Sequence, residues 1–445
     1  MNRIEAEDYI YQSYLRASKH QNYEDKDAQK RDPSITRTFI QSLCNTPCVV
    51  VTGSKGKGSV ANMIANIMQT QKTTGLMTSP HLVDFCERFK VNGQDMAEED
   101  FIKMVETVKP TFDEIDRNLP DERCISPMGI QAAIALLYFA GKRTAFNVFE
   151  CGKGAKYDDV NNIPHDYAVI NSIFLEHTRE LGGSLESIAV DKSHVILPGM
   201  ETVYVAEQQP QVMSIINERA RQCQVRVKVY GKDFKCDNVN YSPQGMTFDV
   251  FVGETCYPHI TIPLMGMHQA KNCALALALC QEVLGALSLD DIRFNLLHLR
   301  WPGRMEVLSS APFVLLDACI NRESCPHVRQ VLQQLKIHRY SLVIGIPDDK
   351  DFSGVAEAMH MEAQRIVLTK SQNPHYVFTP HQISVLAEKG ISSTFANSIQ
   401  EALQLVLPIG DPVVILGTTS VVSEVYQYFL IHFSSPSYPC RGSDN

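Results

Sequence analysis

The sequence lacks the features that mark nucleic-acid-binding and membrane-spanning proteins. Its 41 lysines and arginines are outnumbered by 50 aspartates and glutamates, which gives a formal net charge of −9. Because phosphate binding requires a basic surface, the composition gives no reason to expect a nucleic-acid partner. No apolar run approaches the roughly 20 residues that span a bilayer, so we expect no membrane segment.

The start of the sequence does not resemble a targeting peptide, and the cysteines show no disulfide or metal-binding pattern. Residues 1–8 are acidic and have no apolar core, which is typical of neither a signal peptide nor an Arg-rich transit peptide. None of the 13 cysteines forms a CxxC pair, and no histidine cluster follows the closest pair, Cys44 and Cys48. We therefore expect buried or inert thiols in a cytoplasmic protein.

What is present is typical of a globular α/β protein with two or three domains. Hydrophobic residues make up 44% of the 445 residues and charged residues 20%, which argues against global disorder. Short apolar strands alternate with helices, and this rhythm predicts a mostly parallel sheet with helices on both faces. The predicted strands are 48–51, 75–78, 145–149 and 167–173, and the predicted helices include 59–69 and 126–140.

The pattern changes twice along the chain. Between residues 225 and 262, apolar and polar residues alternate, and we expect antiparallel strands there, at a sheet edge or in a small subdomain. Trp301-Pro-Gly-Arg304 is a predicted boundary turn, after which the α/β rhythm restarts. We therefore predict one domain at 1–304 and a smaller, Rossmann-like α/β domain at 305–445. Its expected strands are 313–317, 341–346, 365–368 and 413–416.

The strongest local motif lies between the first strand and the helix that follows it. It reads Thr52-Gly53-Ser54-Lys55-Gly56-Lys57-Gly58-Ser59. Glycines let backbone N–H groups turn toward phosphates, and the helix start adds the positive end of its dipole. We expect Lys57 to reach the β- and γ-phosphates of a nucleotide and the Ser59 hydroxyl to bind Mg²⁺. The alternative is a solvated Gly/Lys turn.

Two further residues follow strands at the same predicted sheet edge. Glu150 ends the strand 145–149, and His177 follows the strand 167–173. Ligands bind at the carboxyl ends of parallel strands, so Glu150 could hold Mg²⁺ and His177 could be a second ligand or polarise a phosphate oxygen. Taken alone, each residue is more often a cap or a surface group.

Three other residues have plain alternatives. Lys192 by itself is an ordinary helix lysine, and Asn272 could be a surface amide of a helix. Arg304 follows Pro302-Gly303, where a turn arginine can clamp phosphate oxygens or simply carry a linker charge.

Together, these motifs resemble those of the Mur-ligase superfamily, and most closely the folylpolyglutamate and dihydrofolate synthases. The most specific stretch is Thr78-Ser-Pro-His-Leu82 followed by Glu87-Arg88 and Asn92-Gly93, which is similar to S-P-H-L…E-R…N-G in that family. The other similar segments are Gly53–Ser59, Glu150–Gly154, Glu176–Thr178, Gly266–Asn272 and Trp301–Arg304. The resemblance covers about residues 30 to 430.

The resemblance implies an ATP- and Mg²⁺-dependent ligase that adds glutamate to a folate-like carboxylate. It implies nucleotide contacts from Gly53, Gly56, Lys57, Gly58, Ser59, Asn272, Arg304 and Asp317. It implies Mg²⁺ ligands at Ser59, Glu150 and His177, and substrate contacts at Ser79, His81 and Arg88. Lys57, His177 and Lys192 are the implied catalytic residues, with Lys192 carbamylated. We further expect a monomer.

Several residues depart from the family pattern. Lys55 stands where the family has Asn, and Glu176 and Asp191 replace Asp and Glu. The C-terminal motif D-G-A-H-N reads Asp317-Ala-Cys-Ile320-Asn321, so its histidine is missing. The alternatives are therefore a dihydrofolate synthase, a paralogue with a non-folate substrate, or a nucleotide-binding protein with little catalysis.

Overall fold

The computed structural model describes residues 1–21 and 25–432. The chain forms two compact units. The first consists of Met1–Asp237, Asp249–Ile260 and His268–Leu296; the second consists of Asn238–Phe248, Thr261–Met267 and Leu297–Asn445. Residues 433–445, the end of the predicted second domain, lie outside the described part of the chain. The predicted boundary at residue 304 stays a prediction.

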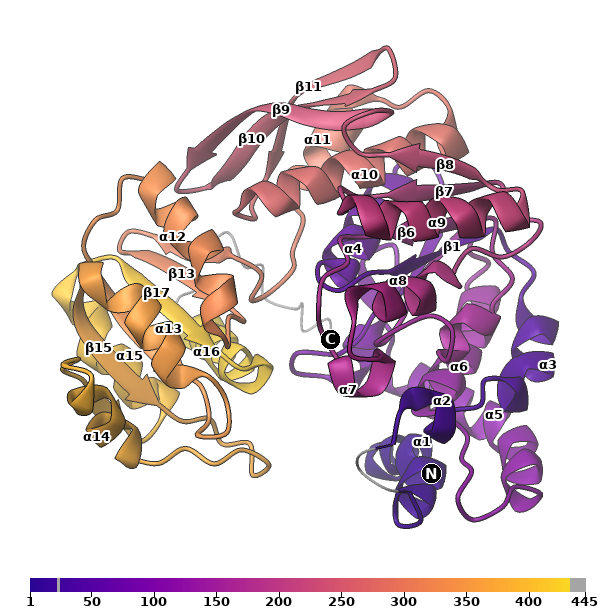
Figure 1. Ribbon diagram of the computed structural model, residues 1–445, viewed down its shortest axis with the longest axis horizontal. Helices are drawn as coiled ribbons and strands as arrows, with labels where there is room; N and C mark the ends of the chain where they lie inside the picture. The colour runs from indigo at the N-terminus through magenta and orange to yellow at the C-terminus, as the bar shows by residue number, and fades with distance from the viewer. Residues whose placement is uncertain (22–24, 433–445) are drawn as a thin grey trace, which may run out of the picture. The chain divides into compact units, whose positions relative to one another are not determined.

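The first unit contains an eight-stranded sheet in the order β4-β3-β2-β5-β1-β6-β7-β8 (Figure 1). The pairings β2–β3 and β3–β4 are antiparallel and the other five are parallel, so the predicted mostly parallel α/β arrangement is confirmed. The strands are β1 Cys48–Thr52, β2 Thr74–Met77, β3 Phe89–Val91, β4 Gln94–Asp95, β5 Phe146–Glu150, β6 Tyr167–Ile170, β7 Thr202–Val205 and β8 Arg226–Val229.

Helices cover this sheet because its central strands are apolar on both faces. All five residues of β1 and of β5 are buried, as expected for parallel strands between helical layers. The helices are α1 Arg3–Ser18, α2 Asp27–Lys30, α3 Ser34–Leu43, α4 Lys57–Met68, α5 Glu98–Arg117, α6 Pro127–Gly141, α7 Thr178–Leu181, α8 Leu185–Ser193, α9 Pro210–Cys223, α10 Met267–Leu284 and α11 Leu289–Leu297.

The alternating segment at residues 225–230 was interpreted wrongly in one respect. It forms β8, which is an edge strand as expected but pairs with β7 in parallel, not antiparallel. An edge strand is only partly covered, so its polar/apolar alternation reflects its position at the edge rather than its direction.

The other alternating stretches form a three-stranded sheet in the order β11-β10-β9. The strands are β9 Phe234–Ser242, β10 Gly245–Val252 and β11 Thr255–Ile262. Two-residue connections join them, which only antiparallel neighbours allow, so the predicted antiparallel strands are confirmed as a small separate sheet.

The second unit contains a six-stranded sheet in the order β12-β13-β17-β14-β15-β16. All neighbours except β12 and β13 pair in parallel, as the restarted α/β rhythm predicts. Its strands are β12 Glu306–Ser310, β13 Phe313–Asp317, β14 Tyr340–Gly345, β15 Ala363–Thr369, β16 Thr394–Ala396 and β17 Val413–Gly417. Its helices are α12 Cys325–Gln334, α13 Phe352–Met359, α14 His381–Glu388, α15 Ile399–Val406 and α16 Thr419–His432.

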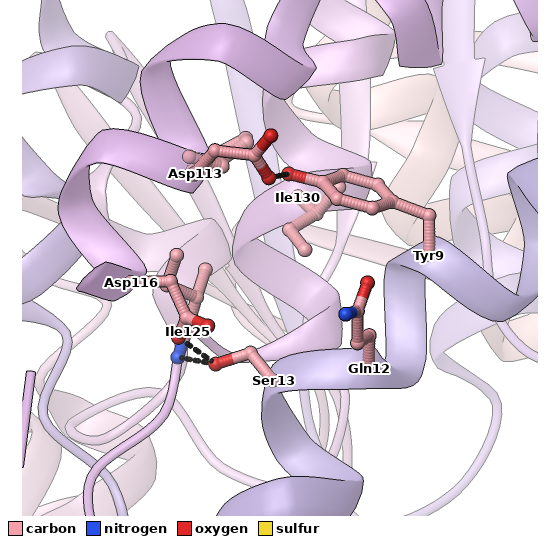
Figure 2. Close-up of a pocket in the computed structure, with 8 residues that line it drawn as sticks. Tyr9, Gln12, Ser13, Asp113, Asp116, Ile125 and Ile130 are labelled. Carbon is pink, nitrogen blue, oxygen red and sulfur yellow. Dashed lines mark hydrogen bonds between the residues drawn. The ribbon is translucent and has the colours of Figure 1, made fainter. Parts of the chain in front are cut away.

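A small polar cavity of about 40 Å³ lies where α1 meets α5 and the segment leading into α6 (Figure 2). Its polar groups bond to one another: the Tyr9 hydroxyl donates to Asp113 at 2.9 Å, and Ser13 donates to Asp116 at 2.5 Å. A cavity of this size holds about one water, whereas ligand pockets measure roughly 300–1,000 Å³. The two hydrogen bonds therefore join α1 to α5. The cavity itself is too small to be a substrate site.

No helix in residues 1–21 and 25–432 is long and apolar enough to cross a membrane.

Candidate active site

The predicted phosphate loop connects the carboxyl end of β1 to the start of α4. Gly53 has φ = 143°, and Gly56 has φ = 75° as the N-cap of α4, conformations that favour glycine. A Cβ atom on Gly53 would lie 2.8 Å from the Asn171 Cβ, so there is also no room for a side chain. Gly58 and Ser59 lie in the first turn of α4 and are buried. The loop therefore presents backbone N–H groups at a helix start, as an anion site requires.

Two lysines converge on one carbonyl oxygen of this loop. Lys57 Nζ donates to the Gly53 oxygen at 3.1 Å, and Lys192 Nζ donates to the same oxygen at 2.9 Å. Lys192 also donates to the Lys153 carbonyl at 2.5 Å and lies 3.2 Å from Glu176 Oε1. Lys192 lies on helix α8, and its side chain is 0% exposed, which is unusual for a helix lysine.

The environment of Lys192 disfavours its charged form. Burial lowers the pKa of this amine, and the positive charge of Lys57 lowers it further, while Glu176 acts in the opposite direction. A lysine with this depressed pKa supplies more neutral amine at a given pH than a solvated lysine does. That is the form that reacts as a nucleophile.

A chain of buried amides links the end of β6 to Ser59. Asn171 donates to Asn272 at 3.0 Å, Asn272 donates to Gln269 at 3.1 Å, and the Gln269 amide lies 3.5 Å from Ser59 Oγ. The alternative of a surface amide at Asn272 is therefore wrong. The sequence analysis did not identify Asn171 and Gln269 as site residues. Asn171 directly follows β6, at the same sheet edge as the loop, and this position could have indicated its role.

Glu150 lies beside the phosphate loop, as predicted. It ends β5, whose register places it opposite Val51 of β1. Its side chain is buried, and Oε2 accepts a hydrogen bond from the Ser79 backbone N–H at 2.9 Å. This bond holds one predicted substrate residue, Ser79, next to one predicted metal ligand.

The other two predicted substrate residues, His81 and Arg88, form a hydrogen-bonded pair. His81 is half-exposed, and Arg88 is buried. Arg88 Nε donates to His81 Nδ1 at 2.9 Å, and Arg88 Nη1 donates to Gln131 Oε1 at 2.7 Å. A guanidinium only donates, so Nδ1 must be unprotonated and the neutral ring carries its proton on Nε2. Burial and the Arg88 charge lower the pKa of His81 to about 4, which agrees with a neutral ring.

His177 differs from the other predicted residues in its exposure and backbone. It adopts left-handed φ = 46° as the N-cap of α7, and its side chain is 44% exposed. Its nearest acidic neighbour is Glu176, at 4.0 Å from Nε2. Strand β6 ends at Ile170, so His177 lies seven residues beyond the strand instead of directly at its end.

Among residues 1–21 and 25–432, no group of three or more His, Cys, Asp and Glu side chains is arranged to hold a metal ion. The predicted Mg²⁺ set contains a serine and two such residues, so its role stays a prediction.

In the second unit, the two predicted nucleotide residues lie close together. The Met305 N–H, next to Arg304, donates to Asp317 Oδ2 at 2.8 Å. The Ala318 N–H donates to the Gly303 carbonyl at 3.0 Å, and Arg304 Nη1 lies 3.4 Å from that same oxygen. The end of β13 and the turn before β12 are thus joined by hydrogen bonds.

The segment that departs from the family motif, Asp317–Asn321, has polar ends and an apolar middle. Asn321 caps a short 3₁₀ helix, Arg322–Ser324, by accepting from the Ser324 N–H at 3.1 Å. Cys319 is buried with its sulfur 3.8 Å from that of Cys325. Ile320 replaces the family's histidine with a side chain that makes no hydrogen bond.

Comparison with known proteins matches residues 51–280 to the Mur ligase middle domain. A dihydrofolate synthase/folylpolyglutamate synthase from Bacillus subtilis is 30% identical over 71% of this chain and 74% of its own length. A folylpolyglutamate synthase structure from Thermotoga maritima has a TM-score of 0.82, 25% identity, and 97% coverage of both chains. A Mycobacterium tuberculosis folylpolyglutamate synthase with ADP and AMPPCP has a TM-score of 0.80, 24% identity, and coverage of 91% and 95%.

Proposed function

Because the chain belongs to the Mur-ligase family, and within it to the folylpolyglutamate and dihydrofolate synthases, we propose that it uses ATP to join glutamate to a folate-type carboxylate. The observation that carries this proposal is the phosphate loop with Lys57 and Lys192 on one carbonyl oxygen, beside Glu150 and the Ser79–Arg88 segment.

The reaction needs ATP because an amine does not usefully attack a carboxylate anion. Transfer of the γ-phosphoryl group to the carboxylate forms an acyl phosphate and releases ADP. The glutamate amine then attacks the acyl carbon, phosphate leaves, and an amide bond results. Negative charge spreads over the transferred group, so positioned positive charge supplies most of the stabilisation.

The loop residues fit the phosphates of ATP. Gly53, Gly56 and Gly58 leave three loop positions without a side chain. A Cβ on Gly56 would lie 2.7 Å from the Asn171 amide nitrogen. Lys57 at the start of α4 would exchange its bonds to loop carbonyls for bonds to phosphate oxygens. The M. tuberculosis relative was solved with ADP and AMPPCP, which supports nucleotide binding as part of this proposal.

The donor atoms near the loop also fit Mg²⁺, which prefers oxygen ligands. The Ser59 hydroxyl and the Glu150 carboxylate come from the elements that follow and flank β1. When bound, Mg²⁺ would offset the charge on the phosphoryl group. The amide chain from Asn171 to Gln269 would hold the Ser59 hydroxyl in place. His177 is proposed to hold a second Mg²⁺.

For the pterin-like substrate, we assign different roles to His81 and Arg88. Arg88 is buried and bonded to His81 and Gln131, so it positions His81 instead of contacting the substrate directly. His81 then offers a neutral Nε2–H donor to a carbonyl or carboxylate oxygen of the substrate. Ser79, held by Glu150, is the adjacent proposed contact.

Lys192 is the proposed carbamate. Carbon dioxide adds to a neutral amine, and the lowered pKa of Lys192 favours that form. The resulting carbamate would replace a buried cation with oxygen donors beside the loop. Arg304 and Asp317 of the second unit remain proposed nucleotide contacts, and the cytoplasmic location and monomeric state belong to the same proposal.

A product analysis tests the function and separates its two forms. The protein is incubated with Mg²⁺, ATP and glutamate together with dihydropteroate, dihydrofolate or tetrahydrofolate, and products are identified by mass spectrometry. Addition of one glutamate residue to dihydropteroate identifies a dihydrofolate synthase, and extension of a folate identifies a folylpolyglutamate synthase. If no acceptor gains glutamate, the proposal is wrong.

One observation favours a different acceptor as the second candidate. Ile320 cannot donate the hydrogen bond that the family's histidine offers, so the incoming amine or its carboxylates would meet an altered site. A paralogue with a non-folate carboxylate or another amino acid would release ADP in a wider substrate screen while leaving every folate unchanged.

A further inference from the structure

Two pairs of cysteines lie close together, and they differ in access. Cys44 and Cys48 belong to the first unit, and Cys319 and Cys325 belong to the second. Neither pair takes part in the proposed ligase reaction. All four are free thiols, so each pair could in principle be oxidised.

The Cys44–Cys48 pair shares one hydrogen-bond acceptor. Cys44 follows α3 as its C-cap, and Cys48 is the first residue of β1. The Cys44 thiol lies 3.4 Å and the Cys48 thiol 3.2 Å from the carbonyl oxygen of Pro164. A short loop and a common acceptor therefore hold both sulfurs within 3.4 Å of the same oxygen atom. Cys48 is fixed further by its backbone N–H, which donates to Asp166 at 3.0 Å.

Only one member of this pair faces open space. Cys44 is half-buried and lines a cleft of about 750 Å³, whereas Cys48 is 0% exposed. The cleft lies at the amino ends of β1 and β6, the sheet edge opposite the phosphate loop. Its other lining residues are Gln41, Asn45, Thr46, Pro47, Asn162, Pro164, His165, Asp166, Leu197, Pro198 and Gly199. This volume falls in the range of sites that accept small molecules.

The electrostatics of the pair give its members different roles. The neighbouring Cys48 thiol lowers the pKa of Cys44, whereas the neighbouring Cys44 thiol together with burial raises the pKa of Cys48 well above its usual value. The thiolate is the reactive form of cysteine. The accessible member is therefore the nucleophile, and the buried member is placed to react second.

We propose that Cys44 and Cys48 form a reversible dithiol–disulfide site for small-molecule disulfides such as glutathione disulfide. The Cys44 thiolate attacks one sulfur of glutathione disulfide, which breaks that S–S bond and releases one glutathione thiolate. Cys48 then loses its proton and attacks the Cys44 sulfur, which forms the Cys44–Cys48 bond and releases the second glutathione. Two protein thiols are oxidised and one disulfide is reduced, and excess glutathione reverses both steps.

The second pair supplies an internal comparison. The sulfurs of Cys319 and Cys325 are 3.8 Å apart, but the two residues are 2% and 0% exposed. Proximity alone would favour a disulfide here as well. Because the first step requires access for the oxidant, we expect this pair to stay reduced under conditions that oxidise Cys44 and Cys48.

The test uses the full-length native protein with glutathione disulfide, followed by blocking of free thiols, trypsin digestion and mass spectrometry. Cys44 and Cys48 lie in one tryptic peptide, residues 38–55. We expect this peptide to lose two hydrogens and to resist alkylation until a reductant is added. The Cys48→Ser variant should instead retain one glutathione on Cys44, and Cys44→Ser should leave Cys48 unmodified.

Cys256, which is exposed, reports whether the oxidant is active, because it should form a mixed disulfide in every sample. Thermal unfolding of each variant checks its folding, and the native protein alone already decides the main outcome. Glutathione on Cys256 with Cys44 and Cys48 both still alkylated would overturn the proposal. Oxidation of Cys319 and Cys325 at the same rate would overturn the role given to access.

Discussion

The phosphate-loop end of the first unit and the Asp317–Asn321 segment of the second unit differ in what their polar residues do. In the first unit, Lys57 and Lys192 share one loop oxygen, and an amide chain leads to Ser59. In the second unit, Asp317 accepts from the Met305 N–H and Asn321 caps a 3₁₀ helix.

This difference shows that some residues of a motif can be kept because they support the backbone, even where a chemically active residue of the same motif has been replaced. The ends of the Asp317–Asn321 segment hold the backbone, whereas Cys319 and Ile320 between them are apolar. The first unit carries the proposed phosphate and metal residues Lys57, Ser59 and Glu150, with Lys192 beside the loop. We therefore expect nucleotide use to be intact and the effect of the departure to fall on the efficiency of ligation.

The largest effect is expected from Lys57→Ala. Losing the charged donor from the loop should lower ATP turnover by at least ~100-fold, while folding changes little because the side chain bonds only to loop carbonyls. Coupled measurement of ADP release and a thermal unfolding curve check both parts. The matched control is Lys55→Ala, which removes an exposed lysine of the same loop. Equal rates for Lys57→Ala and the native protein would disprove the loop assignment.

A large effect is also expected from removing carbon dioxide. Since the pKa of Lys192 is lowered, its neutral fraction grows at a lower pH than that of a solvated lysine, so carbamate occupancy should rise with pH and with bicarbonate. We predict that activity falls in carbon-dioxide-depleted buffer and returns with bicarbonate. NMR with ¹³C-labelled bicarbonate should detect the carbamate. The Lys192→Arg variant should show neither the carbamate resonance nor the recovery of activity with bicarbonate. Full activity without any carbamate resonance would contradict this role.

Restoring the family motif in the second unit should sharpen the comparison. The triple change Ala318→Gly, Cys319→Ala and Ile320→His returns a hydrogen-bond donor worth about 1.5–3 kcal/mol, or roughly one to two powers of ten in rate. Glutamate ligation should rise by that factor while nucleotide affinity stays constant. The double change without Ile320→His is the control. If the triple variant ligates glutamate no faster than the native protein, the replacement of the family's histidine by Ile320 is neutral.

A smaller effect is expected for the metal ligands. Glu150→Gln and His177→Ala should each raise the Mg²⁺ concentration needed for half-maximal activity, by about tenfold or more for Glu150. The shift should be smaller for His177, whose side chain is 44% exposed. Titration of Mg²⁺ at saturating ATP measures both. If neither variant changes the Mg²⁺ dependence, the proposed metal set is wrong.

The sequence was most informative where a function and a local fold coincide. The apolar run 48–51, the glycines after it and the stretch 59–69 predicted a strand, a loop and a helix, and the structure has them as Cys48–Thr52, the loop and Lys57–Met68. Glu150 at a strand end was equally readable. A short apolar strand and a positive-φ glycine are set by nearest neighbours, so they leave a local signal.

Contacts between distant segments left no such signal. Asn171 and Gln269 are ordinary amides until the fold brings them to Asn272 and Ser59. Burial of Lys192 depends on the Lys153 carbonyl, 39 residues away in the chain. The direction of β8 depends on its pairing with β7, which the alternation of its residues does not encode.

The most direct test of the central claim is ADP release by the native protein in an omission series. Mg²⁺-ATP is supplied with a reduced folate and glutamate together, with each alone, and with neither. We predict ADP release only when both are present, with one glutamate joined per ADP formed. ATP that binds but is never hydrolysed in the complete mixture, or is hydrolysed equally without folate and glutamate, would contradict the claim.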